Sequence, residues 1–107
     1  MEDRIGKTLT LLKGRLQELL RDSLVNLVLF GSRARGDYEE SSDVDVAVIV
    51  RGLSRELKDR IYREVAAIEL DHGQLISLLV FSEQEFNRLR ERERRIAKDI
   101  LEEGVAL

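Results

Sequence analysis

Two short apolar runs, separated by a polar stretch, limit the folds open to this chain. The first, residues 24–30, is rich in leucine and valine and stops at Gly31. The second, Asp43 to Val50, alternates two aspartates with valines and then becomes wholly apolar. Runs of this length and composition are typical of strands that pack in a sheet. A small β-sheet is therefore expected at the centre of the molecule.

Segments with helical spacing of apolar residues surround these runs. Residues 3–22 form one such segment, and another follows the N-cap candidate Ser54 and ends near Gly73. A third strand is expected over residues 75–80. After it, Ser82 and Glu85 have the spacing of a capping box and begin a last helix that should run on to Gly104. Its apolar stripe is Phe86, Leu89, Ile96 and Ile100.

The resulting order α-β-β-α-β-α predicts an α/β (α+β) fold in which helices pack on a small mixed β-sheet. A length of 107 residues, 43% of them hydrophobic, predicts one domain over residues 1–107. The chain has no cysteine, which excludes disulfides, thiol catalysis and cysteine-based zinc sites. No apolar run approaches the roughly 20 residues of a membrane span, and the N-terminus does not resemble a signal peptide, so a cytoplasmic protein is expected.

The net charge of the chain limits the kinds of partner that it can bind. The formal net charge is −3, with 18 basic and 21 acidic residues, which argues against a broad basic surface for duplex nucleic acid. The arginine-rich stretch 88–95 is interrupted by glutamates and is interpreted as a solvated helix face. We therefore expect no strong nucleic-acid-binding surface.

The first candidate site lies where the first strand ends. Gly31 lacks a Cβ and Ser32 supplies a hydroxyl, so backbone N–H groups can approach a phosphate closely there. If Ser32 also begins a helical turn, that turn favours an anion at the same place. The pair predicts a site of phosphate size.

The second candidate site is the aspartate pair. Asp43 and Asp45 are two residues apart on a predicted strand, so both carboxylates point to one face while the valines face the other way. Two adjacent carboxylates repel each other, and Mg²⁺ relieves that repulsion because it takes oxygen ligands from carboxylates and phosphates together. The expected ligand is a metal–triphosphate complex.

These residues carry a resemblance. Gly31-Ser32, ten intervening residues and Asp43-Val44-Asp45 resemble the signature of the DNA polymerase beta superfamily of nucleotidyltransferases. The longer strings Gly31 to Gly36 and Ser42 to Asp45 resemble its minimal nucleotidyltransferase branch, short proteins often paired with a HEPN-domain partner as toxin–antitoxin modules.

The resemblance implies transfer of a nucleoside monophosphate, AMP from ATP or another NTP, to a hydroxyl. By that resemblance Gly31 and Ser32 hold the terminal phosphates. Asp43 and Asp45 serve as catalytic residues and bind Mg²⁺, with two ions about 3.5–4 Å apart. Arg33 and Arg35 could bind triphosphate oxygens or, equally, pair with Asp37, Glu39 and Glu40 on the surface, and Arg33 is included as a further candidate for phosphate binding.

One departure from the family pattern concerns a third carboxylate on the later strand. Ser77 stands where that acid is expected, and the nearest acids, Glu69 and Asp71, precede the strand. Asp71 is the candidate substitute. His72, the single histidine, is interpreted as a residue of a helix end rather than as a catalytic base, and Tyr38 either stacks on a base or lies on the surface.

Three classes of function stay open on the sequence. In the first class, the chain is an enzyme that adenylylates a hydroxyl of a protein or nucleic acid. In the second, it is an antitoxin that neutralises a HEPN-type partner by binding to it, while its own nucleotide site is impaired. In the third, it is a subunit that needs a separate acceptor-binding protein. A homodimer is compatible with each of them.

Overall fold

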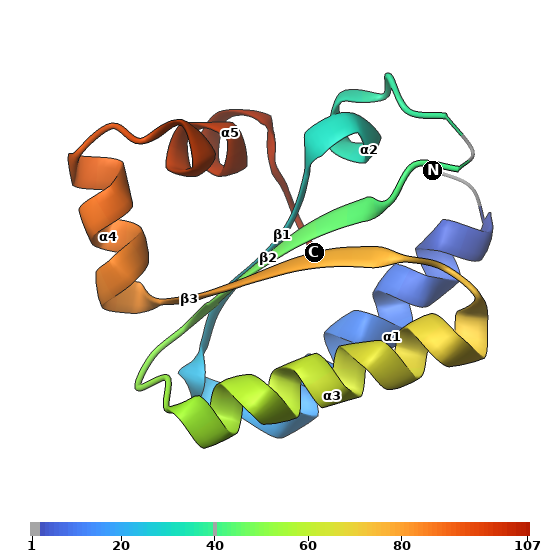
Figure 1. Ribbon diagram of the computed structural model, residues 1–107, viewed down its shortest axis with the longest axis horizontal. Helices are drawn as coiled ribbons and strands as arrows, with labels where there is room; N and C mark the ends of the chain where they lie inside the picture. The colour runs from blue at the N-terminus through green and yellow to red at the C-terminus, as the bar shows by residue number, and fades with distance from the viewer. Residues whose placement is uncertain (1–2, 40) are drawn as a thin grey trace.

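The computed structural model describes residues 3–39 and 41–107 as one mixed sheet with helices on both faces (Figure 1). In chain order the elements are α1 (Asp3–Leu20), the short 3₁₀ helix η1 (Arg21–Ser23), β1 (Leu24–Phe30), α2 (Gly31–Arg35), β2 (Val44–Val50), α3 (Arg55–His72), β3 (Ile76–Ser82), α4 (Glu83–Glu91), α5 (Arg95–Glu103) and β4 (Val105–Ala106). The predicted α/β fold with a small mixed sheet is confirmed.

The sheet has the strand order β3-β2-β1-β4. β1 is antiparallel to both β2 and β4, whereas β2 and β3 run parallel, with the long helix α3 as their crossover. The register places Phe30 of β1, Asp45 of β2 and Ser77 of β3 side by side in one row across the sheet. We call these three residues the site row.

Two apolar layers sandwich the sheet. On one face α1 and α3 pack against the alternating valines of β2, Val44, Val46, Val48 and Val50, all of which are fully buried. On the other face α4 and α5 cover Ala47 and Ile49 (Figure 1). Because α5 lies over the middle of the sheet, the end of that face that carries Asp45 is left to α2 and the loop after it.

Local signals in the sequence explain the element boundaries. The Ser54 hydroxyl accepts a hydrogen bond from Leu57 N at 3.1 Å and caps α3, which ends at Gly73 in the left-handed region. Ser82 and Glu85 form the predicted capping box at the start of α4. Strands β2 and β3 begin one residue later than predicted, and β3 extends to Ser82.

The prediction of one continuous last helix is wrong. α4 ends at Glu91 and α5 begins at Arg95, with Glu93 in the left-handed region at φ 51°. The apolar stripe predicted for one helix is compatible with two, but residues 90–95 are all charged and give a continuous helix nothing to bury. The break turns α5 back across the sheet, where Ala97 and Ile100 become buried. The short strand β4 was not predicted.

None of the helices in residues 3–39 and 41–107 has the length and apolar character needed to cross a membrane.

Candidate active site at the end of β1 and the start of β2

The turn after β1 depends on glycine. Gly31 begins α2 with φ +72°, a backbone conformation that side chains with a Cβ rarely adopt. A Cβ at this position would also overlap Asp45 Oδ2 and lie 3.0 Å from Asp45 Cγ. Glycine is thus required both by the conformation and by the closeness of the carboxylate. The expected helical turn at Ser32 is present, and the Ser32 carbonyl accepts hydrogen bonds from Gly36 N and Asp37 N at 2.9 and 3.2 Å.

The two predicted aspartates lie together at the start of β2. Asp45 is half-buried within the strand, and Asp43 is exposed one residue before it. Burial raises the pKa of Asp45, and the negative charge of Asp43 raises it further, while the Ser77 side chain and the positive charge of Arg35 act in the opposite direction. The structure therefore brings Gly31, Asp43 and Asp45 to one place, with an acidic pair whose repulsion is only partly compensated.

Ser77 occupies the place next to Asp45 in the site row, as predicted, and β3 carries no acid. Glu69 is used elsewhere, because its Oε2 accepts a hydrogen bond of 2.8 Å from Ile76 N at the entrance to β3. Asp71 is exposed at the end of α3 and is not among the groups that shift the pKa of Asp45. No cluster of three or more potential metal-binding side chains is present among the described residues.

Arg33 belongs to α2, and its side chain is buried under the loop that follows this helix. Its side chain is only 4% exposed, Nη2 donates to Ser42 O at 2.9 Å, and its guanidinium stacks on the Tyr38 ring at 4.2 Å. These contacts connect α2 to the residues just before Asp43. Tyr38 thereby has a structural partner that its sequence context did not indicate. Contact between Arg33 and a phosphate stays a prediction.

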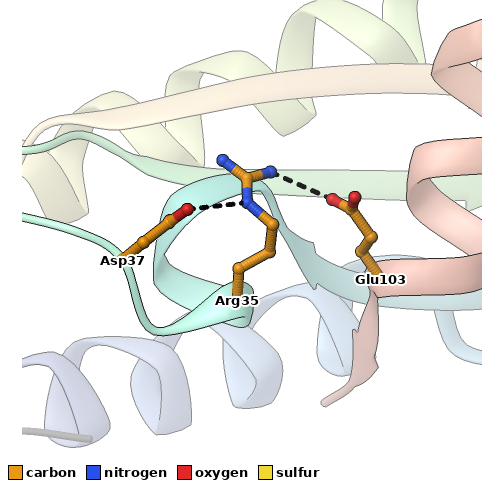
Figure 2. Close-up of polar contacts among 3 residues, drawn as sticks. All are labelled: Arg35, Asp37 and Glu103. Carbon is orange, nitrogen blue, oxygen red and sulfur yellow. Dashed lines mark hydrogen bonds and ion pairs between the residues drawn. The ribbon is translucent and has the colours of Figure 1, made fainter.

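Arg35 links the site to the C-terminal helix (Figure 2). Its Nε donates to Asp37 Oδ2 at 3.2 Å, which is one of the local pairings left open by the sequence, and its Nη1 donates to Glu103 Oε2 at 3.0 Å. The Glu103 contact was missed because its partners are 68 positions apart and share no pattern in the sequence. Both acids raise the pKa of Arg35, Glu103 more than Asp37. Glu40, another of the candidate partners, lies outside the described residues.

His72 lies in the interface between α1 and α3, on the other face of the sheet from the site row. Its Nδ1 is 3.0 Å from the hydroxyl of Thr8, which is completely buried. Arg4 Nη2 donates to the His72 carbonyl, so the end of α3 is fixed to the start of α1. This position agrees with the interpretation of His72 as a helix-end residue.

Several known proteins resemble this chain in sequence and in fold. A family model described as "Nucleotidyltransferase domain" matches residues 9–107. A Methanocaldococcus jannaschii protein named "Putative protein adenylyltransferase MJ0141" is 37% identical over 70 residues, covering 64% of this chain and 71% of that protein. A second from the same organism, "Putative protein adenylyltransferase MJ0604", is 32% identical over 92 residues, covering 86% of each.

Solved structures agree on the fold. A crystal structure of "a putative nucleotidyltransferase from Sulfolobus solfataricus" aligns with a TM-score of 0.53 at 24% identity, covering 99% of this chain and 86% of that one. A chain of a "toxin-antitoxin with AMP-PNP" aligns with a TM-score of 0.52 at 22% identity, covering 88% of this chain and 70% of that one. By the family match and these relatives, the chain belongs to the nucleotidyltransferase domain family and is a nucleotidyltransferase.

Proposed function

We propose that the protein transfers AMP from ATP to a hydroxyl group of a protein acceptor, with Mg²⁺ held by Asp43 and Asp45. The observation that carries this proposal is the contact between the Gly31 backbone and the Asp45 carboxylate. A backbone suited to phosphate oxygens and a carboxylate suited to a cation lie against each other, which is the arrangement that a metal–triphosphate complex requires.

The side chains fit a divalent cation. Asp43 and Asp45 would supply hard oxygen donors, and the pKa of Asp45 is raised, first by burial of the carboxylate and then by the charge of Asp43. A bound Mg²⁺ would offset the negative charge of this pair and would neutralise charge on the phosphates during transfer. A role for two ions is part of the proposal.

The chain's own residues would then position the reactants. Gly31 and Ser32 would hold the β- and γ-phosphates, and Asp43 and Asp45 would hold the cation, whose positive charge would attract the α-phosphate. The acceptor oxygen forms a bond to the α-phosphorus, the bond from the α-phosphorus to the bridging oxygen breaks, and pyrophosphate leaves. Because β3 carries no acid, the acceptor proton passes to water or to a group that the acceptor supplies.

The names of the relatives support the choice of nucleotide and acceptor. Two proteins that share 37% and 32% identity with this chain are named as protein adenylyltransferases, and the toxin–antitoxin neighbour is described with AMP-PNP. We therefore expect ATP as the donor. The resemblance of Gly31 to Gly36 and Ser42 to Asp45 to minimal nucleotidyltransferases leads us to expect a small helical partner of the HEPN type as the acceptor, in the cytoplasm.

A second function is favoured by Ser77. It stands beside Asp45 in the site row, where an active enzyme of this family would be expected to carry its third carboxylate. In this alternative the chain binds ATP and its partner but does not transfer AMP, and it neutralises the partner by contact.

The test is incubation with α-labelled ATP and Mg²⁺, with and without the co-encoded partner. Label transfer is expected with the wild type and should disappear in an Asp43→Asn/Asp45→Asn double variant. The matched control is Asp22→Asn/Asp59→Asn, which removes the same charge from two exposed aspartates of η1 and α3. If Mg²⁺-dependent ATP binding occurs without transfer, and Ser77→Asp creates transfer, the alternative is supported instead.

A further inference from the structure

The outer edge of β3 differs from the other edge of the sheet. β3 is an edge strand of seven residues that pairs with β2 on one side, and no strand in the described part of the chain lies along its other side (Figure 1). Its sequence, Ile-Ser-Leu-Leu-Val-Phe-Ser, contains no charged residue and no proline. β4, at the opposite edge, has two residues. A long uncharged edge is a surface on which another strand can add.

Hydrogen bonds show which backbone groups of β3 point outward. Val44 N donates to Leu75 O at 3.1 Å, so in this parallel pair the groups of Ser77, Leu79 and Phe81 face β2. The groups of the alternate residues, Ile76, Leu78, Val80 and Ser82, therefore face away from the sheet. The Glu69 and Glu85 contacts agree, because they reach Ile76 N and Ser82 N from outside.

These two carboxylates close both ends of the edge. Glu69 Oε2 accepts from Ile76 N at 2.8 Å, and Glu85 Oε1 accepts from Ser82 N at 3.2 Å. Between them, Leu78 and Val80 have outward N–H and C=O groups, and no protein group in residues 3–39 and 41–107 is hydrogen-bonded to these outward groups. The open part of the edge is thus short and is centred on Leu79.

We propose that this edge pairs with the same edge of a second copy, antiparallel, with the two-fold axis passing at Leu79. In that register Leu78 opposes Val80 of the second copy, and each donates to and accepts from the other. On the other side of the axis, Val80 and Leu78 of the second copy form the same two hydrogen bonds. A symmetric pairing needs an edge that is complementary to itself, and the open groups of β3 meet that condition because they are placed equally about Leu79.

The side chains permit the same pairing. Leu79 meets Leu79 of the second copy across the axis, where charged residues of one sign would repel. Ser77 opposes Phe81 of the second copy, which would extend the site row into the neighbouring molecule. Because few hydrogen bonds are available between the two carboxylates, the dimer is expected to be weak and dependent on concentration.

The first experiment measures mass by sedimentation equilibrium over a wide range of protein concentration. The wild type should rise from the monomer mass of 12.3 kDa toward twice that value. Leu79→Lys and Leu79→Glu should each stay monomeric with native circular dichroism, and an equal mixture of the two should again dimerise. A wild type that stays monomeric throughout would overturn the proposal, as would a Leu79→Lys variant that dimerises as well as the wild type.

A second experiment keeps the test valid if the charged variants do not fold. The natural chain has no cysteine, so Leu79→Cys introduces one thiol at the proposed axis. Directly opposed residues of a non-hydrogen-bonded antiparallel pair have Cα atoms about 4.5 Å apart, which is within the range of a disulfide. Mild oxidation should convert Leu79→Cys to a covalent dimer and leave Ser77→Cys, whose copies lie apart in this register, largely monomeric. Equal cross-linking of both, or cross-linking of neither, counts against a second copy. Loss of binding to a different partner protein in the Leu79 variants would point to that protein's strand instead.

Discussion

The two faces of β2 show how one strand can support both a core and a site. Toward α1 and α3 it presents four valines that are fully buried. Toward the other helices it presents Ala47 and Ile49, which are covered, and then Asp45, which α4 and α5 leave half-buried beside Gly31. The valines of the first face can be replaced only by other apolar side chains. The second face combines packed apolar residues with the charge of Asp45, whose burial costs stability. The seven residues of β2 thus have one face that serves the core alone and one face that carries the candidate site as well as core residues.

The largest effect is expected when a charge is introduced on the buried face of β2 or removed from the opposite face. Val46→Asp would place an unpaired carboxylate where Val46 is 0% exposed, and the free energy of unfolding should fall by about 4 kcal/mol or more. Asp45→Val should leave the protein folded and abolish AMP transfer. Urea denaturation and the transfer assay measure the two quantities. If both variants unfold, or both keep activity, the division between the faces is wrong.

A smaller loss is expected at the glycine that contacts Asp45. Gly36 has φ +87° with open space around it, so Gly36→Ala should cost about 1 kcal/mol from the backbone alone. Gly31→Ala has the same kind of backbone strain and also displaces Asp45, so it should cost about 3 kcal/mol and weaken Mg²⁺-dependent ATP binding. Thermal unfolding and a nucleotide-binding titration compare the pair. Equal losses would mean that the contact with Asp45 contributes nothing.

Stability without metal should depend on pH through Asp45. Its folded-state pKa is raised above 3.8, chiefly by burial, so the folded state binds the proton more tightly than the unfolded state. The wild type should therefore lose stability relative to Asp45→Asn as the pH rises from below 3.8 through the raised pKa, and the difference should be constant above it. Because the carboxylate is only partly buried, the effect should be modest. Denaturation of both proteins at several pH values in EDTA measures it, and a difference that does not vary with pH contradicts the assignment.

The smallest effect is expected at the Arg35–Glu103 ion pair (Figure 2). Both side chains are partly exposed, at 43% and 36%, so solvent and salt weaken their attraction. Glu103→Gln should lower the melting temperature slightly at low salt and not at high salt, with Glu102→Gln as the neighbouring control. A loss that persists in high salt would mean that Glu103 acts by packing rather than by charge.

Most of the fold was predictable because short-range patterns determine it. The valine alternation of β2 identifies its buried face, and the Ser82–Glu85 spacing identifies the start of α4. The break between α4 and α5 was missed because the spacing from Leu89 to Ile96 suits one helix, although the charged stretch 90–95 between them leaves a continuous helix nothing to bury there. The strand β4 was missed because two residues carry no periodicity.

The sequence proposes the residues of the candidate site but not their contacts. The spacing and the resemblance single out Gly31, Ser32, Asp43 and Asp45 as candidates, and the structure places Gly31 against Asp45, whose pKa the charge of Asp43 raises. The burial of Arg33 under the loop and the pairing of Arg35 with Glu103 depend on how distant segments meet in space. Such contacts leave no mark in a single sequence, since one arginine in a charged loop resembles any other.

The link between Arg35 and Glu103 also has a consequence for synthesis of the protein. The chain emerges from the ribosome N-terminus first, so the turn at Gly31 leaves the exit tunnel long before α5, which carries Glu103. The partners are 68 positions apart, and β1 obtains its neighbour β4 only after that helix has emerged. During translation, Arg35 therefore has no Glu103 to pair with and β1 has no β4 beside it until the last residues of the chain have emerged.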